Sequence, residues 1–177
     1  MQTDNSSNSD QKILIFGNSG SGKSTLARAL SQSISVTHLD LDTLAWLPTN
    51  PPQRMPLSES ASAIELFISN NTQWIIEGCY ADLLELASSE ATHIIYLDLS
   101  VSDCVKNARE RPWEPHKYPS KQAQDENLNM LINWIRDYEN RNDVFSKISH
   151  HQLFNHYHGK KTRYTTRPSQ QEIIEAL

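Results

Sequence analysis

The segment GNSGSGKS at residues 17–24 constrains this chain more than any other feature. It fits the pattern G-x-x-x-x-G-K-[ST], in which glycines let successive backbone N–H groups converge on a phosphate that the lysine also reaches. A short apolar run, residues 12–16, precedes it, and Leu26, Leu30 and Ile34 recur at helical spacing after it. A strand before and a helix after are the context that this pattern requires, so the sequence predicts a phosphate-binding loop (P-loop) at a helix N-terminus.

The loop supplies the candidate ligands of a nucleoside triphosphate, for which ATP with Mg²⁺ is the expected form. We expect Lys23 to contact the β- and γ-phosphates and the Ser24 hydroxyl to join the Mg²⁺ shell. The full set of candidate nucleotide-binding residues in the loop is Gly17, Asn18, Ser19, Gly20, Ser21, Gly22, Lys23, Ser24 and Thr25.

Apolar periodicity predicts the fold class. Strands are expected at residues 12–16, 36–39, 73–76, 93–97 and 162–166, and helices after the loop and at 58–69, 102–110 and 120–141, with a capping-box sequence at 169–172 opening the last helix. Strands that alternate with helices pair in parallel through right-handed crossovers. The expected architecture is therefore α/β: a three-layer P-loop NTPase fold with a five-stranded parallel sheet and helices on both faces.

The polar segment 1–11 is expected to be a disordered tail, and residues 12–177 a single domain. Two proline-rich stretches, 46–57 and 111–119, interrupt the alternation of strands and helices and are long enough to cover a bound ligand. We expect an acceptor-binding insert at about 43–72 and a short lid at about 111–120, both extending the same domain.

Net charge and composition limit the partners and the location that we expect for this chain. The net charge of −5 over 177 residues argues against nucleic acid as the main partner, and no apolar run is long enough to span a bilayer. Cys79 and Cys104 form no C-x-x-C spacing, which indicates reduced thiols and a cytoplasmic location. Histidines 150, 151, 156 and 158 match no metal template and are expected on surface helices and loops. The oligomeric state stays open.

Missing motifs favour transfer of phosphate over hydrolysis. No D-x-x-G or N-K-x-D element of a GTPase occurs, and the apolar run 94–97 ends in Asp98-Leu99, without the glutamate that prepares water in motor ATPases. In phosphoryl transfer to a bound acceptor, catalysis consists mostly of positioning and charge neutralisation.

Three further pieces, residues 38–46, 74–80 and 94–99, resemble the small adenylate-kinase-like P-loop proteins. The set described as DNA topology modulation proteins, or as shikimate- or adenylate-kinase-like proteins, is the most similar. The resemblance runs from about residue 12 to 177. It implies a five-stranded parallel core, ATP as the nucleotide, an acceptor-binding region after the second strand and a small lid after the fourth.

Carboxylates at strand ends are the candidate metal and catalytic groups, because ligands of open α/β sheets bind at the carboxyl ends of strands. Asp40 and Asp42 follow the second strand; one would orient Mg²⁺ through water while the other accepts the hydrogen of the acceptor hydroxyl. We assign the catalytic role to Asp42 and the metal role to Asp40, with helix capping as the alternative for both. Glu77 stands where adenylate kinases carry an Asp-Gly pair, which makes it a candidate for the Mg²⁺ shell.

Four arginines are candidates through the resemblance. Arg109 and Arg111 occupy the position from which relatives clamp the transferred phosphate, Arg136 lies on the following long helix, and Arg167 follows the last strand, where this fold passes the adenine ring. The alternative for each arginine on a helix is a solvated or ion-paired surface residue.

The leading hypothesis is an ATP-dependent kinase whose acceptor is a small hydroxylated or phosphorylated metabolite. A nucleoside monophosphate kinase is a second, against which the short lid argues. The third is an ATP-binding regulatory or nucleic-acid-associated protein with little or no kinase activity. Trp46, Trp113 and Trp134 either line the acceptor cleft or pack loops against the core.

Overall fold

The computed structural model describes residues 10–177. Residues 1–9 of the expected disordered tail lie outside that range. Asp10 and Gln11, which we had placed in the tail, are joined to the sheet instead: their carbonyl oxygens accept hydrogen bonds from Thr92 Oγ1 (3.1 Å) and Trp74 N (2.8 Å).

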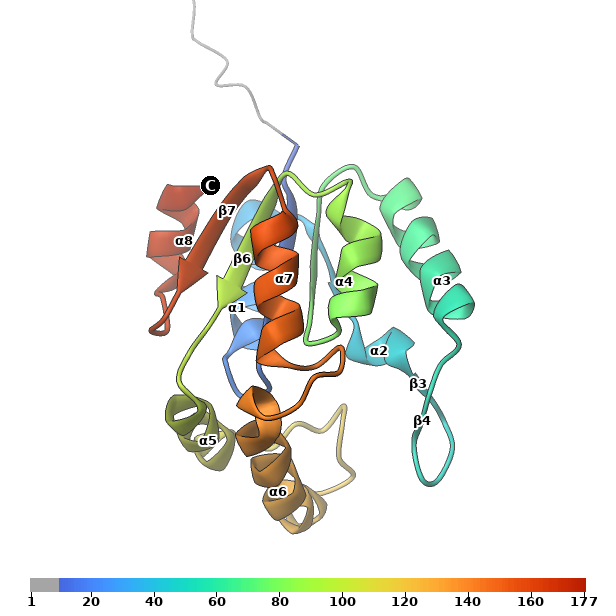
Figure 1. Ribbon diagram of the computed structural model, residues 1–177, viewed down its shortest axis with the longest axis vertical. Coiled ribbons are helices and arrows are strands. Elements are labelled where there is room, and N and C mark those ends of the chain that lie inside the picture. Colours follow the sequence, from blue (N-terminus) through green and yellow to red (C-terminus); the bar gives the residue numbers. More distant parts are fainter. Residues whose placement is uncertain (1–9) are drawn as a thin grey trace, which may run out of the picture.

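Five parallel strands form the central sheet, as expected (Figure 1). Their order is β2-β5-β1-β6-β7, so the strand that leads into the loop lies in the centre. The strands are β1 (Lys12–Gly17), β2 (Thr37–Asp40), β5 (Trp74–Gly78), β6 (His93–Leu97) and β7 (Lys160–Tyr164). A separate antiparallel hairpin pairs β3 (Trp46–Leu47) with β4 (Gln53–Arg54).

The apolar run of β1 is buried because helices cover both faces of the sheet. Ile13 and Ile15 belong to one buried cluster, whereas Leu14 and Phe16, which point to the other face, belong to a second. The first cluster includes residues from α1, α5, α6 and α8, and the second includes residues from α3, α4 and α7. Figure 1 shows α3, α4 and α7 on one side of the sheet and α1 behind it. The α/β fold with two helical layers is thus confirmed.

The helices run as follows: α1 (Lys23–Ile34), α2 (Asp42–Ala45), α3 (Leu57–Asn70), α4 (Ala81–Ser88), α5 (Val101–Glu110), α6 (Lys121–Arg136), α7 (Lys147–His156) and α8 (Gln170–Ala176). The capping box predicted at the start of α8 is present, with Ser169 and Glu172 exchanging hydrogen bonds with each other's backbone N–H. The helices α2, α4 and α7 were not predicted.

Several element boundaries differ from the predictions by one or two residues, and the end of the long helix differs by more. The long helix ends at Arg136 rather than at residue 141, and a 3₁₀ turn, Asp137–Glu139, follows it. The last strand begins two residues early, at Lys160, because it lies at the sheet edge, where exposed lysines are typical.

His150 is not a surface residue, which corrects the expectation for the histidine cluster. Its side chain is fully buried in α7 and burial lowers its pKa to about 4. The ring is tolerated there because both nitrogens have partners: Nδ1 lies 2.8 Å from Tyr138 Oη, and Nε2 lies 2.9 Å from the carbonyl oxygen of Cys79. The Tyr138 hydroxyl also meets that of Tyr96 at 3.0 Å, and Tyr96 donates to Asp98 Oδ1 at 3.0 Å.

Candidate functional site

The P-loop connects the central strand β1 to helix α1, and its glycines are required by space. A Cβ atom at Gly17 would lie 2.3 Å from the carbonyl oxygen of Leu97, and one at Gly20 would lie 2.4 Å from that of Cys104. Gly20 and Gly22 also adopt φ angles of 79° and 90°, which L side chains rarely adopt. The loop is therefore pressed against β6 and α5, and the N–H groups at the start of α1 are left to face a ligand.

Lys23 has a single hydrogen-bond partner among the described residues, and that partner belongs to the loop itself. Its Nζ atom donates to the carbonyl oxygen of Asn18 at 2.9 Å. Asn18 is in turn fixed by its side-chain amide, which donates to the carbonyl oxygen of Ile135 at 3.1 Å. A buried ammonium that pairs with a neutral carbonyl and no carboxylate keeps its charge available, and phosphate oxygens would be stronger partners.

A cavity of about 380 Å³ lies over the loop. Its walls come from three parts of the chain: the loop and α1 (Ser19, Gly20, Lys23, Ser24, Thr25, Arg28), the strand ends (Asp42, Glu77, Gly78, Cys79) and the expected lid (residues 111–118). The structure thus brings together the predicted residues Lys23, Ser24, Asp42, Glu77 and Arg111. We call this space the nucleotide cavity.

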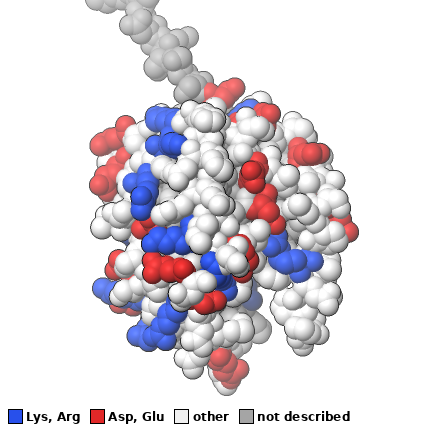
Figure 2. All heavy atoms as spheres, viewed as in Figure 1, with Lys and Arg blue, Asp and Glu red and all other residues white. Residues whose placement is uncertain are grey.

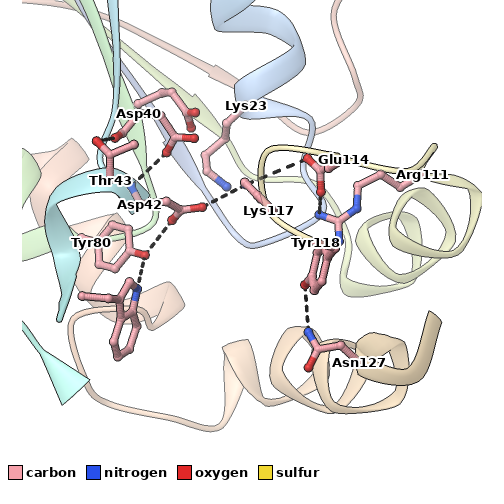
Figure 3. A network of polar contacts seen from close by, with 12 residues as sticks. Lys23, Asp40, Asp42, Thr43, Tyr80, Arg111, Glu114, Lys117, Tyr118 and Asn127 are labelled. Atoms are coloured by element: carbon pink, nitrogen blue, oxygen red, sulfur yellow. Dashed lines mark hydrogen bonds and ion pairs between the residues drawn. The ribbon is translucent and has the colours of Figure 1, made fainter. Parts of the chain in front are cut away.

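Asp42 is held by two partners where it lines the nucleotide cavity. Tyr80 Oη donates to Asp42 Oδ1 at 2.6 Å, and Lys117 Nζ lies 3.0 Å from Asp42 Oδ2 (Figure 3). Burial opposes ionisation of Asp42, but Lys117 and Tyr80 outweigh it and lower the pKa of Asp42. Burial raises the pKa of the Tyr80 hydroxyl, which therefore stays a donor. Asp42 is an ionised, oriented carboxylate at neutral pH.

Asp40 behaves differently, although it lies only two residues away. Its Oδ1 atom accepts a hydrogen bond from the backbone N–H of Asp42 at 2.9 Å, so it closes the turn after β2, as the capping alternative requires. Burial, followed by the charges of Glu77 and Asp42, raises the pKa of Asp40 to about 6.

The residues present fit a Mg²⁺ ion with phosphate ligands. Glu77 is 1% exposed, and its Oε1 atom lacks a hydrogen-bond partner among the described residues; the nearest base, His38 Nε2, is 3.7 Å away. Ser24 and Glu77 line the same cavity. In the described part of the chain no three His, Cys, Asp or Glu side chains are grouped to hold a metal by themselves. That arrangement suits Mg²⁺, which retains waters and phosphate oxygens and takes only one or two protein ligands.

The expected lid segment folds against α6, and an ion pair between Lys117 and Asp42 joins it to the other side of the cavity. Gln124 of α6 accepts from the N–H of Glu114 (2.8 Å) and donates to the carbonyl oxygen of Pro112 (3.1 Å). Arg111 pairs with Glu114 at 3.0 Å, and Lys117 points from the lid toward Asp42 while Lys23 approaches from α1 (Figure 3). Burial opposes the charge of Lys117, but Asp42 outweighs it and raises the pKa of Lys117. Lys117 is therefore a further cation at the nucleotide cavity, beside Lys23, Arg28 and Arg111.

Other predicted residues lie elsewhere. Arg109 and Arg136 line a different surface hollow, between α5 and α6, and Arg136 also lines a larger cavity beside Trp134 and Arg141. Arg167 lies beside the loop: its Nε atom would be 3.5 Å from a Cβ on Gly22, and it lines a small cavity of about 240 Å³ with Ser21 and Thr25. That position agrees with the adenine-framing role that the resemblance implied, and the role itself stays a prediction.

Sequence reasoning missed Lys117 and Tyr80. Lys117 lies inside the segment that was expected to form a lid, so a search for cations in that segment would have found it. Tyr80 ends the piece 74–80 that carried the family resemblance, but its contact with Asp42 joins residues 38 positions apart and leaves no local signal.

The sheet order, with a phosphate loop after the central strand, defines a P-loop protein of the adenylate- and shikimate-kinase-like type. The chain belongs to the AAA domain family AAA_18, whose model matches residues 13–129, more than half of its length.

The chain is also similar to a curated protein and to solved structures. The uncharacterized protein YqaC of Bacillus subtilis (strain 168) is 26% identical over 143 residues, which cover 79% of this chain and 80% of that protein. The shikimate kinase from Acinetobacter baumannii in complex with shikimate superimposes with a TM-score of 0.53 at 14% identity, covering 94% of this chain and 92% of that chain. A gluconokinase from Sinorhizobium meliloti 1021 gives 0.53 and 14%, covering 94% and 88%. At these identities the structural likeness shows a shared kinase-like fold. None of the helices in residues 10–177 has the length and apolar character that crossing a membrane needs.

Proposed function

We propose that the protein is a kinase that transfers the γ-phosphate of MgATP to a small acceptor carrying a hydroxyl or phosphate group. The observation that supports this most directly is the nucleotide cavity itself, where Lys23 of the loop, Asp42 of the strand end and Lys117 of the lid line one space. A cation for the phosphates, an ionised carboxylate and a covering segment with a second cation are the parts that phosphoryl transfer requires.

Each group has a distinct task in this proposal. The N–H groups of the loop and Lys23 bind the β- and γ-phosphates, and Ser24 with Glu77 holds Mg²⁺, which neutralises phosphate charge when bound. Asp42 Oδ2 accepts the hydrogen bond of the acceptor hydroxyl once Lys117 leaves it, and Lys117 then follows the transferred phosphate. We assign the charge of the transferring phosphate to Lys117 and Arg111, which line the nucleotide cavity, whereas Arg109 does not and Arg136 lines only the adjoining larger cavity.

Charge on the surface favours a small acceptor over a nucleic acid. Figure 2 shows acidic and basic side chains interspersed on one face of the molecule. A polyanion needs a continuous basic stripe, and the overall charge is −5.

The test is a turnover screen in which ATP and Mg²⁺ are incubated with hydroxy acids, sugar acids, nucleosides and nucleoside monophosphates, and products are followed by ³¹P NMR. We expect one acceptor class to yield ADP and a phosphorylated product in equal amounts, with Lys23→Ala inactive. ADP formation that no acceptor stimulates, at a rate equal in Lys23→Ala, would contradict the proposal.

A further inference from the structure

A second and larger cavity, of about 1120 Å³, adjoins the nucleotide cavity. Ser19, Lys117, Tyr118 and Leu131 line both spaces, so the two are continuous at the lid. The larger cavity lies between the hairpin β3–β4 and helix α6, with Trp46, Leu47 and Pro52 on one side and Met130 and Trp134 on the other. Its position, next to the transferring phosphate and under the expected acceptor insert, makes it the acceptor cavity.

The wall of the acceptor cavity rests on stacked aromatic rings. Trp46 lies parallel to the buried Phe145, with ring centroids 6.3 Å apart and planes 5° apart, and Trp134 meets Phe145 edge-on at 5.1 Å. The guanidinium of Arg141 lies 3.6 Å from the ring centroid of Trp134. Indole and guanidinium planes are the surfaces on which flat unsaturated rings stack, because dispersion and cation–π attraction both require a π face.

The acceptor cavity also contains polar side chains that can hydrogen-bond to the nitrogen and oxygen atoms of a ring. The Arg141 side chain is only 11% exposed, and its buried Nε atom has no hydrogen-bond partner among residues 10–177, since the nearest carboxylate oxygen, of Asp143, is 3.6 Å away. A buried donor without a partner costs free energy, and a ligand recovers it where the Arg141 side chain turns to open Nε to the cavity. Asn133 and Asn140 also line the cavity, and their amides can donate and accept at a ring edge.

The aromatic wall is connected to the reacting end. Trp46 Nε1 donates to Tyr80 Oη at 2.8 Å, and the same hydroxyl donates to Asp42 Oδ1 at 2.6 Å. A ring placed against Trp46 is therefore held by the same chain of hydrogen bonds that orients the catalytic carboxylate. The distance from the aromatic wall to Asp42 is bridged by one tyrosine side chain, so a ring-bearing acceptor can present its oxygen there.

We propose that the phosphate acceptor carries a planar heteroaromatic ring, as nucleosides and nucleoside monophosphates do, and that this ring stacks on the wall formed by Trp46, Trp134 and Arg141. This inference rests on the proposed function for its reaction but concerns only what the acceptor cavity recognises. A polyhydroxylated acid has no flat ring to place against this aromatic wall, and each of its hydroxyls would need a hydrogen-bond partner.

Binding is tested with the nucleotide cavity filled, so that an adenine ring cannot be misassigned. Protein saturated with Mg²⁺ and a non-hydrolysable ATP analogue is titrated by calorimetry with guanosine, uridine, thymidine and cytidine, their 5′-monophosphates, shikimate and gluconate. We expect at least one base-bearing compound to bind and the two acids to bind weakly. Comparing nucleosides with monophosphates tells whether the acceptor oxygen belongs to a sugar or a phosphate.

Two pairs of variants locate the ring. Trp134→Leu is expected to weaken base binding by about tenfold, since loss of one stacking partner has that size, whereas Trp134→Phe keeps a π face and most of the affinity. Arg141→Lys keeps the charge, loses the plane and the Nε donor, and is expected to weaken binding by a similar factor. Ile148→Ala, at an exposed position of α7 outside both cavities, is the control.

The outcomes separate the two proposals. Base binding that Trp134→Leu weakens, without phosphoryl transfer to any acceptor, would support the ring site and contradict the kinase. Transfer to an acceptor without a ring, together with base binding that is absent or equal in Trp134→Leu, would support the kinase and overturn the ring site. Unchanged affinity for the ATP analogue in each variant shows that the fold is intact.

Discussion

The nucleotide side and the acceptor side of this molecule are built by different means. The nucleotide side is built mainly from backbone: Gly17 and Gly20 press the loop against main-chain carbonyls of Leu97 and Cys104, and a few side chains, among them Asn18 and Lys23, complete it. The acceptor side is a side-chain structure, in which the hairpin, α6 and the lid meet through aromatic rings and the Lys117–Asp42 ion pair. A backbone cradle suits a constant ligand such as a triphosphate, whereas a side-chain wall can change with the acceptor.

The largest effect is expected from a substitution that changes only the nucleotide side. Lys23→Ala removes the only loop ammonium, and phosphoryl transfer should fall below detection while ATP affinity drops by about 100-fold, the order expected for a lost charged hydrogen bond. Calorimetry with MgATP measures the affinity, and binding at the acceptor cavity should be unchanged. Undiminished ATP affinity in a folded variant would contradict the phosphate-loop assignment.

Asp42→Asn should lower turnover and leave ATP binding unchanged. The amide keeps the shape and the contact with Tyr80 but cannot accept the hydroxyl hydrogen as a carboxylate does, so turnover should fall by about 100-fold or more. ATP affinity should remain that of the wild type, because Asp42 lies on the acceptor side. Transfer close to the wild-type rate would reduce Asp42 to a structural role and move the catalytic one to Asp40.

Lys117→Ala tests a residue that the two sides share, because Lys117 lines both cavities. Losing one of the cations that line the cavity near the transferred phosphate should lower kcat by about tenfold. Lys121→Ala, an exposed residue paired with Asp125 at the start of α6, is the matched control and should keep the wild-type kcat. Equal kcat values in both variants would show that Lys117 serves only to latch the lid.

Hydrogen exchange measures directly whether the two proline-rich segments close over bound ligands. Residues 111–119 and 46–57 should gain protection only when an ATP analogue and an acceptor are added together, because closure must exclude water from the transferring phosphate. Protection confined to residues 17–25 would identify both segments as passive loops.

The smallest effect is expected far from both sides, at His93 in β6. Burial, then the charge of Lys160, lowers the pKa of His93 from 6.5 to about 4. The folded protein therefore keeps this ring neutral while the unfolded chain takes up a proton below pH 6.5, so stability is lost as the pH falls from 6.5 toward 4. In urea unfolding, the stability advantage of wild type over His93→Gln should shrink between pH 7.5 and 5. A difference that does not vary with pH would show that His93 titrates normally.

The same division explains what the sequence could predict. The loop, β1 and the cap of α8 were predictable because the information is local, within a few residues of Gly17 or Ser169. Helix α7 was missed because its buried face carries His150, which is polar and becomes a core residue only through partners 12 and 71 positions away. The acceptor wall likewise joins residues 46, 134 and 145, whose proximity is set by the packing of α6 and the hairpin.

The buried chain that joins Asp98 to the main chain of Cys79 is one proton short when His150 is neutral. Four contacts form it, through Tyr96, Tyr138 and both nitrogens of His150, but the two hydroxyls and the neutral ring supply only three hydrogens. If Tyr96 gives its hydrogen to Asp98 and Nε2 gives its own to Cys79, Tyr138 can serve only one of its two neighbours.

A proton on His150 would complete all four contacts, while burial of the imidazole opposes it. Burial opposes ionisation of Asp98, but Arg163 outweighs it, lowers the pKa of Asp98 and keeps it ionised. Neither protonation state of His150 therefore both completes the four contacts and avoids a buried charge. Removing the Tyr96 hydroxyl relieves the deficit, because every remaining contact then has a hydrogen. Removing the Tyr138 hydroxyl instead leaves Nδ1 of His150 bare. Tyr96 and Tyr138 are both buried, but loss of the Tyr96 hydroxyl removes the shortage of hydrogens, whereas loss of the Tyr138 hydroxyl removes the hydrogen-bond partner of His150 Nδ1.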